Sequence, residues 1–319
     1  MKPYLQYLVV LLDNTSIAYC HAENPLQERK LIPIDTLRQA ILFGMKQNLM
    51  LQFVYPDYEL PQEYNELIES IDHVKIGRDV IVCNRVEELP VSNVNTIVLR
   101  LTINDFITNV QTIVSHLAYF KRLNITLTDI ESFTDDLIPA YKEALSVLSD
   151  AIAAQYKVRN QLQVNILTDR LQLTEMRNCD AGIGNITLAP NGKFYLCPAF
   201  YYDEQMDISN RMNYKIKDAT RSVGDLQHGI QIPNKQLLQL DHAPLCRICD
   251  AYHCHRCIWL NQRLTWDNNT PSRQQCLIAH VERNATQHLQ AELQTIGYQF
   301  EKQIENITYL DPFEVRNEI

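Results

Sequence analysis

The sequence predicts an α/β fold, in which a parallel sheet covered by helices is followed by a small loop-rich region containing most of the cysteines. Short apolar runs alternate with helical patterns in the first half, which is typical of parallel strands joined by helices. Glycine is almost absent up to residue 168, but five glycines and seven cysteines follow between residues 179 and 276. That second region needs more than a large apolar core to order it, and bound metal can supply this.

Six strand-like runs carry the first part of the prediction. They are Tyr4–Leu12, Leu49–Tyr55, Val80–Asn84, Thr96–Leu101, Asn124–Asp129 and Gln163–Thr168. Six strand–helix units would form an open or partial (β/α)6 barrel, and periodicity leaves an ordinary open α/β sheet as the alternative.

Three helical patterns between these runs have an apolar face. Asp35 is predicted to cap the first, Asn104 the second, and the third begins near Asp135. The predicted buried faces are Leu37, Ile41 and Met45; Phe106, Val110, Ile113 and Leu117; and Tyr141, Ala144, Leu148 and Ile152.

Composition and charge exclude some classes of partner. The net charge is −9 and no basic block is present, which argues against a nucleic-acid partner and leaves a peptide partner open. The apolar stretch from Leu5 to Leu12 is too short to span a bilayer, and Asp13 follows it with no cleavage site for a signal peptide. We therefore expect an opening strand, a cytoplasmic protein and no membrane partner.

The cysteines fall into a pattern that predicts metal ligation. Cys20 and Cys83 stand alone in the first half, and we expect Cys20 to be a plain buried thiol. The other seven form one cluster, and without a secretion signal such a cluster favours metal over disulfides. Cys179 and Cys197 enclose an Asn191-Gly192 pair that predicts a β-hairpin with a type I′ turn.

The remaining cysteines have two-residue spacings that suit both zinc and iron–sulfur sites. A zinc ribbon would use four closely spaced residues, Cys246, Cys249, Cys254 and Cys257. It would leave the other three of the seven idle, and the four-residue gap in its middle is short for a ribbon built from two hairpins. His253 and His255 are possible zinc ligands, or polar residues that hydrogen-bond to sulfur.

The cysteine pattern resembles the SPASM domain, which follows the radical SAM barrel in many peptide-modifying enzymes. The resemblance covers Cys-x12-Gly-x4-Cys, the Pro190-Asn191-Gly192 turn, Cys197-Pro198, the segment from Ser222 to Leu226, and the late cysteines. The spacings of four and two residues differ from the five and three that are usual in the family.

The resemblance implies two [4Fe–4S] clusters. Cys246, Cys249, Cys254 and Cys276 would bind the first cluster, and Cys179, Cys197 and Cys257 would bind the second. The second set lacks a fourth cysteine. A substrate cysteine thiolate could fill that position, or a protein ligand could, with Asp180, His242, His253, His255 and Cys83 as the candidates.

The first half resembles a radical SAM barrel that has lost its catalytic cluster. If Cys20 matches the last residue of the family's Cys-x3-Cys-x2-Cys motif, the other two positions hold Asp13 and Ile17, and isoleucine cannot ligate iron. The segment from Tyr55 to Glu59 lacks the glycine turn of the family. We therefore expect no S-adenosylmethionine site.

This combination is similar to accessory maturation proteins of CXXX-repeat peptide systems. It implies an iron–sulfur-binding partner of a precursor peptide and of a separate radical SAM maturase, with no autonomous activity assigned. The alternatives are a structural zinc-binding adaptor and a divergent radical SAM peptide-modifying enzyme. The expected domains are the degenerate radical SAM-like barrel (1–170), the SPASM-like iron–sulfur domain (171–285), and a C-terminal helix and tail (286–319).

Overall fold

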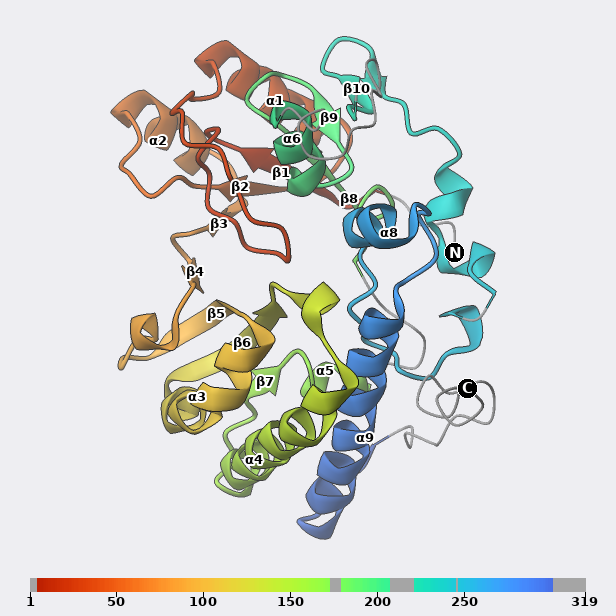
Figure 1. Ribbon diagram of the computed structural model, residues 1–319. Helices are drawn as coiled ribbons and strands as arrows, with labels where there is room; N and C mark the ends of the chain where they lie inside the picture. Colours follow the sequence, from red (N-terminus) through yellow and green to blue (C-terminus); the bar gives the residue numbers. More distant parts are fainter. Residues whose placement is uncertain (1–4, 173–178, 207–220, 245, 301–319) are drawn as a thin grey trace. The chain divides into compact units, whose positions relative to one another are not determined.

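The computed structural model describes residues 5–172, 179–206, 221–244 and 246–300 (Figure 1). The chain divides into two compact units, each formed by two segments. Unit 1 combines residues 1–81 with 180–239, and unit 2 combines residues 82–179 with 240–319. The fold is mixed α/β with mostly parallel strands, as predicted. The predicted domain limits stay a prediction, and the long helix Arg273–Thr295 runs through residues 285 and 286.

Unit 1 is built on parallel strands around β1. Strand β1 (Tyr7–Leu11) pairs in parallel with β2 (Met50–Val54) and with β8 (Asn185–Leu188), and β2 pairs with β3 (His73–Ile76). Leucines and valines of β1 are buried, as expected for a strand covered on both faces. The strand β3 was missed because its four residues are only partly buried and show little apolar pattern.

Other elements complete unit 1. The helices are α1 (Ile34–Lys46), α2 (Gln62–Glu69) and α6 (Pro198–Gln205), and a second hairpin joins β10 (Gly224–Asp225) to β11 (Gly229–Ile230). The helix α1 begins earlier than predicted, since Asp35 lies in its first turn, where it pairs with Arg38. Met45 is exposed, against the prediction, whereas Leu37 and Ile41 are buried.

The predicted hairpin is present, but its turn is of another type. Strand β8 pairs antiparallel with β9 (Phe194–Tyr195), and the Gly192 N–H donates to the Ala189 carbonyl at 2.9 Å. Of the two predicted turn residues only Gly192 has positive φ, at +77°, whereas a type I′ turn requires positive φ at both. Pro190 precedes Asn191 and favours a turn followed by a left-handed glycine.

Unit 2 contains three parallel strands and the longest helices. Strand β5 (Val94–Leu101) pairs with β6 (Phe120–Leu127), which pairs with β7 (Gln163–Val164). The helices are α3 (Ile103–His116), α4 (Ile138–Lys157), α5 (Thr168–Gln172), α8 (Ile258–Thr265) and α9 (Arg273–Thr295). Strand β4 (Val80–Cys83) lies where the two units divide.

The predicted apolar faces of α3 and α4 are confirmed, because every residue named for them is buried. The aromatic ring of Tyr141 packs edge-on against Phe106 at 5.5 Å and against Phe133 at 5.6 Å between centroids. The cap of α3 is Thr102 rather than Asn104, since the Thr102 hydroxyl accepts from the Asp105 N–H. Residues 135–137 form a short 3₁₀ turn before α4 begins.

Candidate metal centre

Four of the predicted ligands come together in unit 2. Burial, followed by negative charge on Cys246 and Cys249, raises the pKa of Cys276 to about 12. Burial also raises the pKa of Cys254, as does charge on the other three cysteines. Cys249 lies beside α9, the helix that carries Cys276, because its sulfur is 3.7 Å from His280 Nε2. The first predicted ligand set is named the thiol group below.

Short turns present two of these sulfurs to backbone donors. The Cys249 N–H donates to the Cys246 carbonyl at 3.2 Å, which closes a turn over the first pair. The Ala251 N–H donates to the Cys249 sulfur, and the Arg256 N–H donates to the Cys254 sulfur, both at 3.4 Å. N–H donors favour the thiolate, the form that binds metal.

Positive charge also lies beside the thiol group. Burial raises the pKa of Cys246, and the Arg256 guanidinium opposes this effect. Arg256 is only 1% exposed. Cys276 lies in the first turns of α9, whose Ser272 cap is completed by Gln275, and a helix N-terminus favours negative charge. One turn further along α9, His280 Nε2 lies 3.7 Å from the Cys249 sulfur.

A buried ion pair holds the loop between Cys249 and Cys254. Arg170 from α5 donates through Nε to the Ala251 carbonyl at 2.8 Å and through Nη2 to the His253 carbonyl. The same guanidinium contacts Glu282 of α9 at 2.8 Å, and both side chains are 0% exposed. Two helices are thereby joined to the backbone that carries the cysteines.

Glu282 is the centre of this network, which we name the Glu282 clamp, comprising Glu282, Arg170, His255 and Tyr141. His255 Nε2 lies 2.8 Å from Glu282 Oε1, and the Tyr141 hydroxyl donates to the same oxygen at 2.7 Å. Burial alone would raise the pKa of Glu282, but His255 and Arg170 outweigh it and lower the pKa to about 2. Glu282 is therefore a carboxylate at neutral pH.

The second predicted set is divided between the units. Cys197 belongs to unit 1 and is the N-cap of α6, directly after β9. Cys257 belongs to unit 2, is buried and is the N-cap of α8, and Cys179 of unit 2 is exposed. The N-cap position places two of the three sulfurs at helix ends that favour negative charge. Their role as ligands of one cluster stays a prediction.

The candidates for a fourth ligand differ in their surroundings. His255 is engaged by Glu282, and burial followed by the charge of Arg170 lowers the pKa of His253 to about 4. His242 ends a 3₁₀ turn, and Asp180 belongs to unit 1. Cys83 is buried and lies 3.5 Å from the Glu88 carbonyl oxygen, to which its thiol donates.

The two lone cysteines differ from each other. Burial raises the pKa of Cys83 to about 11, as expected for a buried thiol. Cys20 is partly exposed, so the prediction that it is buried is wrong. It lies in the long segment between β1 and α1, and the residues around it form neither helix nor strand. Its neighbours in sequence include the polar residues His21 and Glu23.

In unit 1, the loop after β1 is closed by its own polar side chains. Asp13 is buried, and its Oδ1 accepts from the N–H of Thr15 at 2.8 Å and from its hydroxyl at 2.6 Å. Ser16 donates to the Val54 carbonyl of β2 at 2.9 Å. Ile17 packs against Gly77, where an added Cβ would lie 2.5 Å from its Cδ1. Asp13 and Ile17 thus serve local packing.

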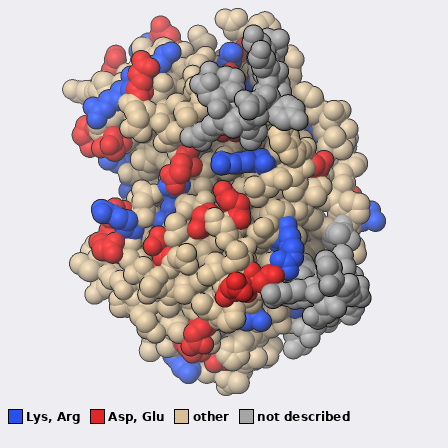
Figure 2. Space-filling model, viewed as in Figure 1, with Lys and Arg blue, Asp and Glu red and all other residues tan. Residues whose placement is uncertain are grey.

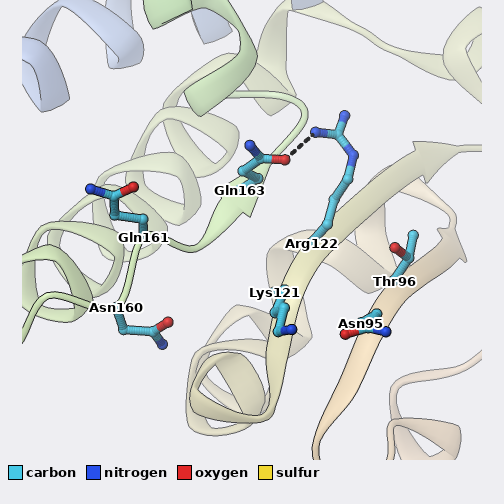
Figure 3. Close-up of a pocket in the computed structure, with 7 residues that line it drawn as sticks. All are labelled: Asn95, Thr96, Lys121, Arg122, Asn160, Gln161 and Gln163. Carbon is cyan, nitrogen blue, oxygen red and sulfur yellow. Dashed lines mark hydrogen bonds between the residues drawn. The ribbon is translucent and has the colours of Figure 1, made fainter.

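A polar hollow lies at the amino ends of the unit 2 strands (Figure 3). It measures about 510 Å³, and its lining is Asn95, Thr96, Lys121, Arg122, Asn160, Gln161 and Gln163. Arg122 donates to Gln163 at 3.0 Å and pairs with Asp169 at 2.7 Å. The amide groups can hydrogen-bond a polar ligand, but the lining contains no cysteine, so this hollow is distinct from the thiol group.

Residues outside the cysteine pattern were missed by sequence reasoning. Arg170, His280 and Glu282 stand singly in helical segments, and Arg256 lies between Cys254 and Cys257 with no pattern of its own that marks it as part of the site. An arginine or glutamate at a buried position of an otherwise apolar helix face is the only local signal, and it does not name the partner.

No protein-family model matches the chain, and comparison with curated proteins finds no relative. Within the described residues, every helix is too short or too polar to cross a membrane. On the face drawn in Figure 2, basic and acidic side chains are interspersed, in keeping with the absence of a basic block in the sequence.

Proposed function

We propose that this protein is an iron–sulfur-binding accessory maturase for a ribosomally synthesised, cysteine-containing peptide, acting with a separate radical SAM enzyme. The observation that carries the proposal is the thiol group of Cys246, Cys249, Cys254 and Cys276. Cys276 lies 22 residues after Cys254 in the sequence. Even so, negative charge on the other members of the group contributes to the raised pKa of both Cys254 and Cys276.

The residues present fit a [4Fe–4S] cluster. Four thiolates can take its four iron corners, backbone N–H groups face two of the sulfurs, and Arg256 and the α9 N-terminus add positive character. A bound cluster would supply electron transfer. The raised thiol pKa values of Cys254 and Cys276 mean that loading the site releases protons.

The membership of the thiol group supports iron–sulfur over zinc. A zinc ribbon would pair the first three cysteines with Cys257, which lies next in the run. The charges that raise the pKa of Cys254 instead include that of the distant Cys276. This is the ligand set that the SPASM resemblance implies for one cluster.

The accessory role rests on the loop after β1. A radical SAM site needs three thiolates there, and the chain has Asp13 and Ile17 in two of the places. Both side chains take part in local packing. A partner enzyme would therefore supply the radical chemistry, while this chain binds the peptide or the enzyme.

Cys179, Cys197 and Cys257 would hold a second cluster at three corners. A substrate cysteine thiolate at the fourth corner would anchor the peptide, because an open iron is thiophilic. A ligand from the protein at that corner is the alternative. The two cases differ in their response to an added peptide.

Metal analysis of anaerobically purified protein tests the proposal. Iron and sulfide should be present in stoichiometric amounts, with broad visible absorbance, and Cys249→Ala should lose part of both. The control is Cys20→Ala, which removes a thiol that belongs to neither predicted ligand set. Colourless protein with stoichiometric zinc would establish the zinc adaptor instead, and equal iron in Cys249→Ala and wild type would refute the ligand assignment.

Electron paramagnetic resonance on the reduced protein tests the peptide role. A cysteine-containing peptide should change the cluster spectrum if its thiolate binds iron, and the same peptide with serine in place of cysteine should not. Binding of both peptides with an unchanged spectrum would exclude the open corner. Cleavage of S-adenosylmethionine by the reduced protein would instead support a divergent radical SAM enzyme.

A further inference from the structure

A second group of metal-binding side chains lies away from the cysteines in unit 2. Asp150 of α4 and His288 and Glu292 of α9 each offer a ligand atom, and these atoms lie within 4.8 Å of one another. The two helices run beside each other in Figure 1. His288 and Glu292 are one helical turn apart, and the distance from His288 Nε2 to Glu292 Oε1 is 3.5 Å.

An adjoining hollow of about 280 Å³ leads to this group along the same two helices. Its lining is Lys142, Ser146, Ser149, Val281, Asn284, Ala285 and His288. The residues follow helical spacing on each side, and His288 belongs both to the hollow and to the ligand group. His288 therefore connects the hollow with the ligand group.

Two oxygens in this region have no hydrogen-bond partner among the described residues. Ser149 lines the hollow, is 0% exposed, and its hydroxyl is unpaired. Glu292 Oε2 is likewise buried and unpaired. A buried polar group without a partner costs free energy, so both oxygens are suited to a ligand or to water held by one.

We propose that Asp150, His288 and Glu292 bind a divalent first-row transition-metal ion such as zinc. One imidazole nitrogen and two carboxylate oxygens suit such an ion, and three protein ligands leave a position for water. Beside His288, the hollow offers the Ser149 hydroxyl, which can accept or donate a hydrogen bond. Two carboxylates near one point repel each other, and a cation between them removes this cost.

The site is separate from the thiol group. His288 is twelve residues beyond Cys276 on α9, which corresponds to roughly 18 Å along the helix axis. Lys142, the cation of the hollow, is eight residues before Asp150 and therefore about 12 Å from it along α4. The ion can therefore bind whether or not the cysteines hold iron.

Cobalt(II) titration of the full chain tests the site, because thiolate ligation gives an intense charge-transfer band and imidazole–carboxylate ligation does not. Calorimetry should detect one bound cobalt ion that adds nothing to the charge-transfer band. The variant His288→Ala should lower the cobalt affinity of this site by about tenfold or more, since even losing a supporting partner of a metal ligand lowers metal affinity roughly 10–100-fold. Asp150→Asn should weaken it as well.

The matched control is His116→Ala, which removes a partly exposed histidine from another helix of unit 2. It should bind cobalt as wild type does, and so should Cys249→Ala. His288 is 58% exposed, so its variant should keep the wild-type circular dichroism spectrum. Equal affinity in wild type and His288→Ala overturns the proposal, as does the lack of any cobalt binding outside the thiolate band.

Discussion

Replacing Glu282 by glutamine should strongly destabilise unit 2. The change keeps the shape of the side chain and removes the charge that faces Arg170 at 2.8 Å and His255 at 2.8 Å. Arg170 would then be a fully buried cation without its counter-ion. Breaking a buried pair in this way costs about 3–5 kcal/mol, far more than the loss of an exposed pair.

Urea unfolding followed by tryptophan fluorescence measures the free energy of unfolding of unit 2. The chain has two tryptophans, Trp259 and Trp266, and both belong to unit 2. Trp259 is 8% exposed and lies on α8, two residues after Cys257. Its emission therefore reports on the cysteine region. With a urea dependence of about 1–3 kcal/mol per molar, the midpoint should fall by on the order of 2 M.

The control is Glu143→Gln on the exposed side of α4, which removes the same charge from the same unit. An exposed substitution of this kind changes the free energy of unfolding by less than about 0.5 kcal/mol. If Glu282→Gln behaves like this control, the buried network does not stabilise unit 2, and the description of the Glu282 clamp as a support for the cysteine loop is wrong.

The same pair of proteins has a defined pH dependence. The pKa of Glu282 is lowered to about 2 in the folded protein, against about 4.3 when unfolded. Its stabilising contribution is therefore fully present above pH of about 4.3 and is lost as the pH falls towards 2. The difference in unfolding free energy between wild type and Glu282→Gln should shrink over this window, and a constant difference would contradict the assignment.

Three further outcomes are expected. Cys254→Ala should lower the iron content and the unfolding midpoint of unit 2, whereas Cys20→Ala should leave iron unchanged; the reverse order would contradict the ligand assignment. Calorimetry on reconstituted protein should detect no tight binding of S-adenosylmethionine, and a micromolar dissociation constant would show that the loop at Asp13 was misinterpreted. Gly192→Ala should destabilise unit 1 by roughly 1–2 kcal/mol in thermal unfolding, because its φ is +77°; an unchanged melting temperature would refute this.

Local patterns in the sequence were sufficient for much of the secondary structure. All six predicted runs contain a strand, and the faces of α3 and α4 are buried as their periodicity indicates. Cap residues were less predictable, because Asp35 and Asn104 resemble caps but each helix is capped two residues earlier. The choice between a (β/α)6 barrel and an open sheet depends on long-range arrangement, which periodicity does not contain.

The two proposed metal sites show the same limit in different ways. The thiol group was predictable because most of its cysteines lie within a few residues of each other, and their chemistry is rare. The group of Asp150, His288 and Glu292 joins two helices more than a hundred residues apart in sequence, and each residue type is common on exposed helix faces. Only the packing of α4 against α9 brings them together.

The loop that carries Cys249 and Cys254 is surrounded by buried charged residues, several of which are distant from it in sequence. Three arginines, Arg170, Arg256 and Arg283, are almost fully buried there, and two carboxylates, Glu282 and Asp250, lie against them. Buried charge of one sign is costly unless it is balanced. A metal held by four thiolates would carry net negative charge beside Arg256, so loading the thiol group would couple metal binding to the folding of unit 2.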